Sequence, residues 1–373
     1  MDTQQKLEIL SDASRYDLAC ACGTKNAEDH RTRGRDGSWL YPVSLPGGGY
    51  SVILKTLISN VCNNDCKYCP FRSSVDLPRC TIDSEAMARI FLDYLGTKKI
   101  FGLFLSSGII GTPDHSMRFL NDTAAILRKK HRYRGYIHLK VIPGASDAAI
   151  EESLSLASAV SLNIETPGDR HCRQLSLKKN YSVDIIRPLK LISALTRKGM
   201  KYEGVKTTTQ FIVGASDETD REIVRYTSGL YDRLKMHRVY FSAYQRGYGD
   251  PSLPGEQAVQ SRGDENFVRE HRIYQADFLL RRYGFVLGDF MFDAGGMFSL
   301  DKDPKQSWVD SHPDLFPVMI HSATKETLLR IPGIGPVTAR MIVRQRKEGR
   351  IGSWEQLGLA GKRLRQVRQY AVL

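Results

Sequence analysis

Residues 51–70 read SVILKTLISNVCNNDCKYCP, an apolar strand-like run that leads directly into three closely spaced cysteines. Cys62, Cys66 and Cys69 follow a C-x3-C-x2-C spacing. Thiolates suit soft metals, and three of them on one tight loop can reach three corners of one cubane iron–sulfur cluster. The run supplies no fourth cysteine, so it predicts a [4Fe–4S] cluster with one open iron, as a catalytic zinc keeps one open position.

Two alternatives for these cysteines stay open at this stage. One is a closed zinc site completed by Cys80 or a histidine, although zinc sites usually show two cysteine or histidine pairs and no second pair follows here. The other is a purely structural cluster, which needs four nearby cysteines. Cys20 and Cys22 with Cys80 could hold an auxiliary cluster, but dispersed cysteines are more often buried thiols. An odd total of seven cysteines favours metal binding in a reducing compartment over a disulfide framework.

Outward from the cysteines, short apolar runs alternate with longer amphipathic stretches. The expected strands are 51–59, 100–106, 136–142, 160–164, 208–213 and 238–242, and the stretches between them include 84–95, 116–131 and 182–198. This alternation predicts an α/β fold with a parallel sheet built from βα units. Periodicity alone does not separate a doubly wound sheet from one curled into an open barrel.

Composition shifts divide the chain into four expected parts. Residues 1–49 form an N-terminal extension, with a helix near 7–16 and a polar, glycine-rich loop. The barrel spans 50–245, and a helical insert and loop-rich connection spans 246–316, including a helix over 266–283 and a loop over 301–317. An all-α module occupies 317–373. No internal repeat of fixed period is evident.

The cysteine run, the aromatic Tyr68 before its third cysteine and its place after the first strand resemble the radical S-adenosylmethionine (SAM) superfamily. The resemblance implies a partial (β/α)6 barrel. It also implies a [4Fe–4S] cluster that binds SAM and cleaves it reductively to a 5′-deoxyadenosyl radical, with electrons from a donor such as flavodoxin or ferredoxin. The active site is then expected at the carboxyl ends of the strands.

Other positions are similar to the SAM contacts of that family. The expected cofactor-binding residues are Tyr68, Ser106, Ser107, Gly108, Lys140, Asn163, Glu165, Gln210 and Gly214. The turn at Ser106 lacks the acidic residue that the family usually carries there, so carbonyls and hydroxyls would have to contact the SAM amino group. Lys140 is expected to pair with the SAM carboxylate. Cys172 is a candidate catalytic hydrogen-atom donor, because some radical SAM repair enzymes use a cysteine in that role; the alternative is an inert buried thiol.

The C-terminal region is strongly basic and contains the sequence LLRIPGIGPVTAR at 328–340. The chain has a net charge of +13, and residues 321–373 carry 11 Lys+Arg against 3 Asp+Glu. The motif resembles a helix-hairpin-helix element, whose glycines let a phosphate approach backbone N–H groups. Expected nucleic-acid contacts are Gly333, Gly335, Thr338, Arg340 and Arg344. The alternative is a hairpin that packs against protein.

Taken over nearly its full length, the sequence is similar to putative DNA modification or repair radical SAM proteins associated with uracil-DNA glycosylase-like genes. Stretches such as SLNIETP at 161–167 and REHRIYQADFLLRRYGF at 269–285 carry this resemblance. It implies a nucleic-acid substrate, DNA in preference to RNA, and a DNA-repair partner. The rival functions are an RNA-modifying enzyme acting on transfer RNA, a protein- or peptide-modifying radical enzyme, and a non-catalytic iron–sulfur DNA-binding protein.

The sequence contains no apolar run long enough to span a bilayer, and residues 1–10 lack the apolar core of a signal peptide. We therefore expect a cytoplasmic protein without a membrane partner.

Overall fold

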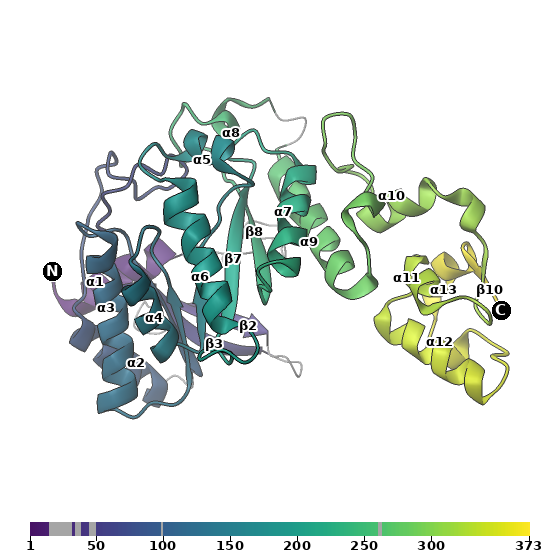
Figure 1. Ribbon diagram of the computed structural model, residues 1–373, viewed down its shortest axis with the longest axis horizontal. Helices are drawn as coiled ribbons and strands as arrows, with labels where there is room; N and C mark the ends of the chain where they lie inside the picture. Colours follow the sequence, from purple (N-terminus) through teal and green to yellow (C-terminus); the bar gives the residue numbers. More distant parts are fainter. Residues whose placement is uncertain (15–31, 34–38, 45–49, 98–99, 260–262) are drawn as a thin grey trace. The chain divides into compact units, whose positions relative to one another are not determined.

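The structure, a computed structural model, describes residues 1–14, 32–33, 39–44, 50–97, 100–259 and 263–373 (Figure 1). These residues form two compact units. The first comprises residues 1–218 and 229–267, and the second comprises residues 219–228 and 268–373. Each unit is described by itself below.

The first unit is built on one eight-stranded sheet. Its strands are β1 (Thr32–Arg33), β2 (Trp39–Ser44), β3 (Tyr50–Leu57), β4 (Gly102–Ser106), β5 (Tyr136–Lys140), β6 (Ala159–Ser161), β7 (Lys206–Val213) and β8 (Arg238–Ala243). From β3 to β8 every neighbouring pair is parallel, so the prediction of six parallel strands is confirmed.

Strand order decides between the two parallel architectures that periodicity left open. The order is strictly sequential from β1 to β8, whereas a doubly wound sheet reverses direction at a switch point. The sheet is curled into an open half-barrel, as expected for a partial barrel. Because β3 to β8 are parallel, their carboxyl ends share one edge, and loops from distant parts of the sequence meet there.

Helices connect the parallel strands. They are α2 (Ser84–Thr97), α3 (Pro113–Ala125), α4 (Asp147–Leu156), α5 (Asp169–Leu175), α6 (Arg187–Thr196) and α7 (Asp220–Asp232), with π-helical turns at Ile126–Lys130 and Tyr181–Ile186. Two further helices, α8 (Pro254–Gln257) and α9 (Glu265–Tyr283), follow the last strand. In Figure 1, α2, α3, α4 and α6 lie along one face of the sheet. Local signals start them: Thr112 caps α3 by accepting from the His115 amide, and Pro113 occupies its first turn.

The N-terminal extension differs from its prediction. Helix α1 (Thr3–Ala13) forms with a capping box between Asp2 and Gln5, but 39–44 is the antiparallel strand β2 and not a loop. The sequence did not predict this strand because Pro42 argues against one. Pro42 pairs with Val52 of β3, and the described pairs between β1 and β2 are Thr32 with Leu40 and Arg33 with Trp39. Proline is uncommon inside a sheet because it has no N–H to donate to the ladder.

The second unit carries the C-terminal module. Its elements are α10 (Pro304–Asp310), β9 (Val318–Met319), α11 (Lys325–Arg330), α12 (Pro336–Glu348), α13 (Gly361–Arg368) and β10 (Ala371–Val372). Two corrections follow. The module is not all-α, because β9 and β10 pair in parallel, and the expected loop at 301–317 contains α10. Asp303 caps that helix and Pro304 starts it, a signal that the sequence did carry.

The C-terminal module has its own apolar core. Leu328, Ile331, Ile334, Ile342 and Val367 are each at most 1% exposed and belong to one cluster. These aliphatic side chains fix α11, α12 and α13 relative to one another. Across the described residues, no helix combines the length and apolarity needed to cross a membrane.

Candidate active site and basic hairpin

The cysteine loop, residues 60–70, leaves the carboxyl end of β3 at the shared edge of the sheet. Cys66 is buried, and Cys62 and Cys69 are half-buried. The Cys69 amide donates to the Cys66 carbonyl at 2.8 Å, which closes a tight turn. Burial raises the pKa of the Cys69 thiol to about 12, and the neighbouring Cys66 adds to the increase. Burial also raises the pKa of Cys66.

The donor set fits a cluster better than a single ion. The three thiols interact electrostatically with one another, so they share one region. Yet among the described residues no three Cys, His, Asp or Glu side chains converge as ligands of one metal ion. A cubane needs no such convergence, because each thiolate binds a different iron. Three soft, clustered thiols therefore suit a [4Fe–4S] cluster held at three corners.

Arg79 braces the loop through its backbone. Its guanidinium donates to four carbonyl oxygens, those of Asn60, Phe71, Arg72 and Val75, at 2.6–3.0 Å. These carbonyls lie on both sides of the cysteines. One side chain thus joins the two ends of an irregular segment that has no ladder partner of its own.

The segment after α5 holds the middle of the loop. The Lys67 amide donates to the Leu175 carbonyl at 2.8 Å. Asp65, between two of the cysteines, accepts from the Ser176 hydroxyl and from the Leu177 amide. Burial alone would raise the pKa of Asp65, but these hydrogen bonds outweigh it and lower the pKa. The thiols are therefore held on a fixed backbone.

The turn after β4 packs directly against the cysteine loop. The Gly108 amide donates to the Ser59 carbonyl at 2.8 Å, and a Cβ at Gly108 would lie 2.2 Å from the Val61 carbonyl oxygen. Ser106 is buried, and its carbonyl accepts from the Ile58 amide. Within the described residues, the buried Ser107 hydroxyl has no hydrogen-bond partner. It is the polar atom of this turn that remains available to a ligand.

Glu165 lies at the centre of a buried polar group beside the loop. It is 6% exposed, and its carboxylate accepts from the Tyr68 hydroxyl at 2.9 Å and from Asn163 Nδ2 at 3.4 Å. Its φ of +65° is in the left-handed region, and its backbone bonds to β7 on both sides, through Gln210 and Ile212. Tyr68 of the cysteine loop is thus brought together with Asn163 and Glu165, which were both predicted from the stretch 161–167.

Lys179 completes this group and was missed by the sequence analysis. Its side chain is 8% exposed, and Nζ lies 4.0 Å from Glu165 Oε1. Burial alone would lower the pKa of Lys179, but Cys66 and Glu165 outweigh it and hold the pKa above its usual range. Lys140, expected to pair with the SAM carboxylate, ends β5 in register with Ser161. A lysine gives no sequence signal of burial, because lysines are usually exposed.

Gln210 and Gly214 lie at the end of β7. The Gln210 carbonyl accepts from the Glu165 amide, and Gln210 pairs with Tyr240 of β8. Gly214 has φ +86°, and a Cβ there would lie 2.2 Å from Asn266 Oδ1. A side chain is therefore excluded at Gly214.

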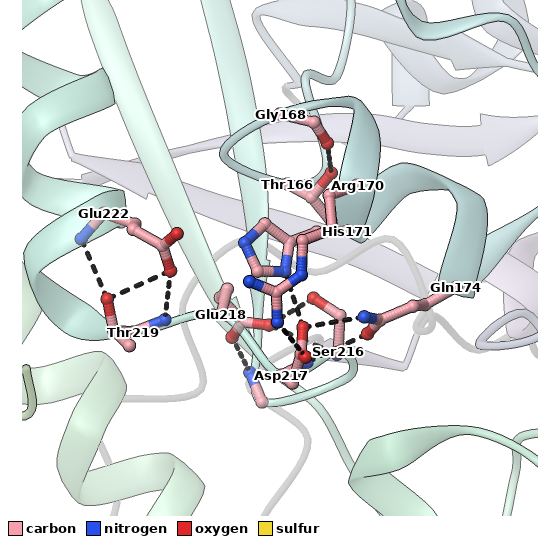
Figure 2. A network of polar contacts seen from close by, with 11 residues as sticks. Thr166, Gly168, Arg170, His171, Gln174, Ser216, Asp217, Glu218, Thr219 and Glu222 are labelled. Atoms are coloured by element: carbon pink, nitrogen blue, oxygen red, sulfur yellow. Dashed lines mark hydrogen bonds and ion pairs between the residues drawn. The ribbon is translucent and has the colours of Figure 1, made fainter. Parts of the chain in front are cut away.

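Figure 2 shows how α5 is tied to the turn at 214–218. Asp217 of the turn is hydrogen-bonded to His171 Nδ1 at 2.8 Å and accepts from Gln174 Nε2 at 2.7 Å. Arg170 also donates to Asp217. None of these residues was singled out from the sequence as a polar network. Its effect is to fix α5, which carries Cys172, against the turn.

Cys172 lies in the same neighbourhood as the cluster loop. It is buried, and burial raises its pKa to about 11, while the nearby Lys179 lowers it and Glu165 raises it. Cys80 is also buried, with Sγ 3.9 Å from the Lys6 carbonyl oxygen. Cys20 and Cys22 lie outside the described residues, so the auxiliary cluster is still a prediction.

The hairpin turn, residues 331–335, joins α11 to α12 in the second unit. Gly333 has φ +83°, and Gly335 is the residue that caps α12. Arg340 and Arg344 are exposed on α12. Thr338 is buried, and its hydroxyl accepts from Arg363. Thr338 therefore does not lie on the surface that presents the two arginines.

Comparisons with known proteins bear on the first unit. Residues 56–227 match the family model described as the radical SAM superfamily. No curated protein matches the sequence.

Solved structures give low similarities. The [FeFe]-hydrogenase maturase HydG from Carboxydothermus hydrogenoformans is similar at 16% identity and a TM-score of 0.45 over 61% of this chain and 51% of that one. Methylornithine synthase (PylB) gives 12% identity and a TM-score of 0.46 over 60% and 62%. The cobalamin-dependent SAM radical enzyme OxsB gives 13% and 0.35 over 79% and 46%. The chain thus spans about half the length of HydG, and TM-scores below 0.5 carry no functional argument.

The family match and the cysteine loop agree on the same part of the chain. Residues 56–227 include Cys62, Cys66 and Cys69 and most of the parallel sheet. Residues 56–227 are therefore identified as a radical SAM domain, and members of this superfamily use a [4Fe–4S] cluster and SAM.

Proposed function

We propose that this protein reductively cleaves SAM and uses the resulting 5′-deoxyadenosyl radical to modify or repair a nucleic acid, DNA in preference to RNA. One observation carries the proposal. A single chain combines a three-cysteine loop braced at the carboxyl edge of a half-barrel with a separate module that exposes arginines beside a glycine turn.

Cys62, Cys66 and Cys69 would hold the cluster. Bound there, a [4Fe–4S] cluster would supply the one electron needed to break the bond between the SAM sulfur and C5′, which would give methionine and the 5′-deoxyadenosyl radical. The electron comes from a low-potential donor protein of the flavodoxin or ferredoxin class, and radical SAM enzymes in general need such a reductant.

The residues around the loop supply complementary polar contacts for SAM. The free Ser107 hydroxyl is suited to the amino group, where the family usually has an acidic side chain. Lys179 is a buried cation that interacts with Cys66 of the loop, so we assign the SAM carboxylate to Lys179. Glu165, held by Tyr68 and Asn163, is placed to accept from SAM hydroxyl or amino groups.

Cys172 is our candidate for returning a hydrogen atom to a substrate radical. Its thiol is protonated at neutral pH, because burial raises its pKa to about 11, and a hydrogen-atom donor must carry its hydrogen. In that step the S–H bond breaks, a C–H bond forms on the substrate, and a thiyl radical is left, which the external reductant and a proton restore to the thiol.

The hairpin module would bind the nucleic acid through its backbone. Arg340 and Arg344 are one turn apart on α12 and both exposed. The Gly333 and Gly335 amides have no hydrogen-bond partner among the described residues, so they are available to donate to a phosphate. Phosphate contacts carry no base information, so affinity should be insensitive to sequence and should fall steeply with salt. A base inside a duplex would have to be flipped out to reach the radical.

Anaerobic reconstitution with deuterated oligonucleotides tests the proposal. We expect SAM-dependent transfer of deuterium from DNA into 5′-deoxyadenosine, and no transfer from RNA of the same sequence. The Cys66→Ser protein is the matched negative, because it keeps the hairpin but lacks a cluster ligand. Transfer from RNA alone would establish the RNA-modifying alternative. Uncoupled 5′-deoxyadenosine with no deuterium from either polymer would contradict a nucleic-acid substrate.

A further inference from the structure

Three carbonyl oxygens of the hairpin turn accept from cationic side chains. Lys305 of α10 donates from Nζ to the Ile331 carbonyl at 2.7 Å and to the Ile334 carbonyl at 2.9 Å. Arg363 of α13 donates from Nε to the Gly333 carbonyl at 2.7 Å. Two residues outside the turn thus fix the direction of its peptide groups.

This fixation decides where the backbone N–H groups point. In a trans peptide the C=O and N–H vectors are antiparallel. Because the Ile334 carbonyl is directed at Lys305, the N–H of Gly335 in the same peptide plane is directed away from Lys305. Among the described residues, neither the Gly335 amide nor the Gly333 amide has a hydrogen-bond partner. A cation behind a peptide also strengthens the positive end of its dipole at the N–H.

Lys305 is held in place by its own surroundings. Its ammonium lies 4.8 Å from the centroid of the Tyr283 ring. The charged groups that face it are Asp303, the N-cap of its own helix, Arg330 of α11 and Arg363 of α13. Burial and the two arginines lower the pKa of Lys305 to about 7, although Asp303 opposes the decrease. Lys305 therefore changes charge near neutral pH.

We propose that Lys305 is a positioning residue for nucleic-acid binding: it holds the Ile334–Gly335 peptide so that the Gly335 N–H faces a backbone phosphate. The inference rests on the proposed function, since it concerns how the hairpin grips a polynucleotide. Lys305 itself is bonded to the turn and does not contact the phosphate.

The test compares two lysines of the same segment. Lys305→Met removes the two bonds to the turn but keeps an unbranched side chain over Tyr283. Lys302→Met removes the same unit of charge three residues earlier, where Lys302 is exposed and paired with Asp310. Binding is measured by fluorescence anisotropy with a labelled DNA duplex at several salt concentrations, using the full-length protein.

We expect Lys305→Met to weaken binding on the order of tenfold, the usual consequence of losing a hydrogen bond that involves a charged group. The slope of log affinity against log salt should stay as in the wild type, because no phosphate contact is lost. Lys302→Met should change affinity less than about twofold. Lys305→Arg, which keeps a cation with several N–H donors, should restore part of the affinity.

The pH dependence of DNA affinity in the wild-type protein gives a test that does not depend on how well a variant folds. Below about pH 7 Lys305 is charged, and above it the charge is lost, so wild-type affinity should fall as the pH rises through about 7. In Lys305→Met this step should be absent, while titration of the histidines is unchanged. Stability moves the other way. The unfolded chain holds a proton on this lysine up to its ordinary pKa of 10.5, so wild-type stability should rise between about pH 7 and 10.

Two results would overturn the inference. One is a wild-type protein that binds DNA, loses affinity in Arg344→Ala, yet shows equal affinity in Lys305→Met and Lys302→Met. The other is a wild-type affinity with no pH step through about 7 that Lys305→Met removes. Failure of the proposed function looks different, because the wild-type protein would then not bind the duplex in a salt-dependent way at all.

Discussion

The cysteine loop and the hairpin turn are stabilised by the same device and differ in what the device exposes. In both, basic side chains donate to the carbonyls of an irregular backbone segment, Arg79 in the first and Lys305 with Arg363 in the second. In the cysteine loop this arrangement surrounds clustered thiols. In the hairpin turn it leaves two N–H groups without partners among the described residues. One loop is suited to a metal cluster and the other to an anion.

Some of the basic side chains behind the net charge of +13 bind carbonyls of the chain itself. Arg79, Arg128 and Arg346 each donate to two or more backbone carbonyls. These cations stabilise the folded chain locally, so part of the surplus is structural. The residues that would meet a polyanion are the exposed ones, and counting Lys and Arg from the sequence cannot separate the two groups.

Replacing all three loop cysteines by alanine should give the largest effect. We expect loss of the iron–sulfur absorbance and complete loss of SAM cleavage, because each iron corner loses its ligand. Binding to a DNA duplex should be unchanged, since the hairpin belongs to the other unit.

Cys80→Ser is the matched control for the cysteine variant. Cys80 is buried and free but lies outside the loop, so its serine variant should retain the cluster. Loss of iron in Cys80→Ser would mean that Cys80 is a ligand, and the three-cysteine assignment would have to be abandoned.

Arg79→Met should have the next largest effect, on the stability of the first unit. Removing the guanidinium leaves up to four carbonyls without their donor, and we expect a loss of about 3 kcal/mol in the free energy of unfolding. Urea denaturation measures it, with Arg89→Met on the exposed face of α2 as the control, expected to change stability by less than about 0.5 kcal/mol. Equal losses of unfolding free energy in the two variants would show that Arg79 does not stabilise the cysteine loop.

Gly108→Ala should perturb the cysteine loop without removing any polar group. The new Cβ would lie 2.2 Å from the Val61 carbonyl oxygen, so the loop must shift, at a cost of about 2 kcal/mol. We expect lower iron content after reconstitution, measured per chain. Gly96→Ala is the control, because nothing lies within 4 Å of a Cβ at that position. Normal iron content in Gly108→Ala would show that the contact does not constrain the loop.

Arg344→Ala should give the smallest effect and would sharpen the distinction between exposed and bracing cations. Losing one phosphate contact should weaken DNA binding severalfold and reduce the salt slope by about 1. Arg346→Ala, two residues further on, removes a cation that donates to the Ile320 and Ala323 carbonyls. It should lower stability and leave the salt slope unchanged. The opposite pattern would reverse the roles of the two arginines.

Much of the first unit could be predicted from the sequence because strand and helix signals there are regular. The cysteine run and the six parallel strands were found. The sequential strand order did not follow from βα alternation, which also fits a doubly wound sheet, and it was expected only from the family resemblance. Strand β2 was missed because a proline usually argues against a strand, and only the structure shows that Pro42 pairs with Val52 of β3.

The residues that were missed are those whose role depends on contacts between distant segments. Lys179 and Lys305 look like ordinary surface lysines in the sequence, and only the fold places them against Glu165 and the hairpin turn. Thr338 was predicted to face a phosphate but is buried. It lies one turn before the buried Ile342, so helical spacing could have indicated an inward position.

Glu165 has one further consequence. A glutamate with φ +65° adopts a conformation that its own backbone disfavours by roughly 1–2 kcal/mol, so the chain gives up folding stability at that point. Its two bonds to β7 hold it there. Strained backbone conformations of this kind are concentrated at active sites, where activity requires a side chain in a particular orientation. Selection for thermal robustness alone would therefore be expected to replace this glutamate with glycine or asparagine, whereas selection for catalysis would retain it.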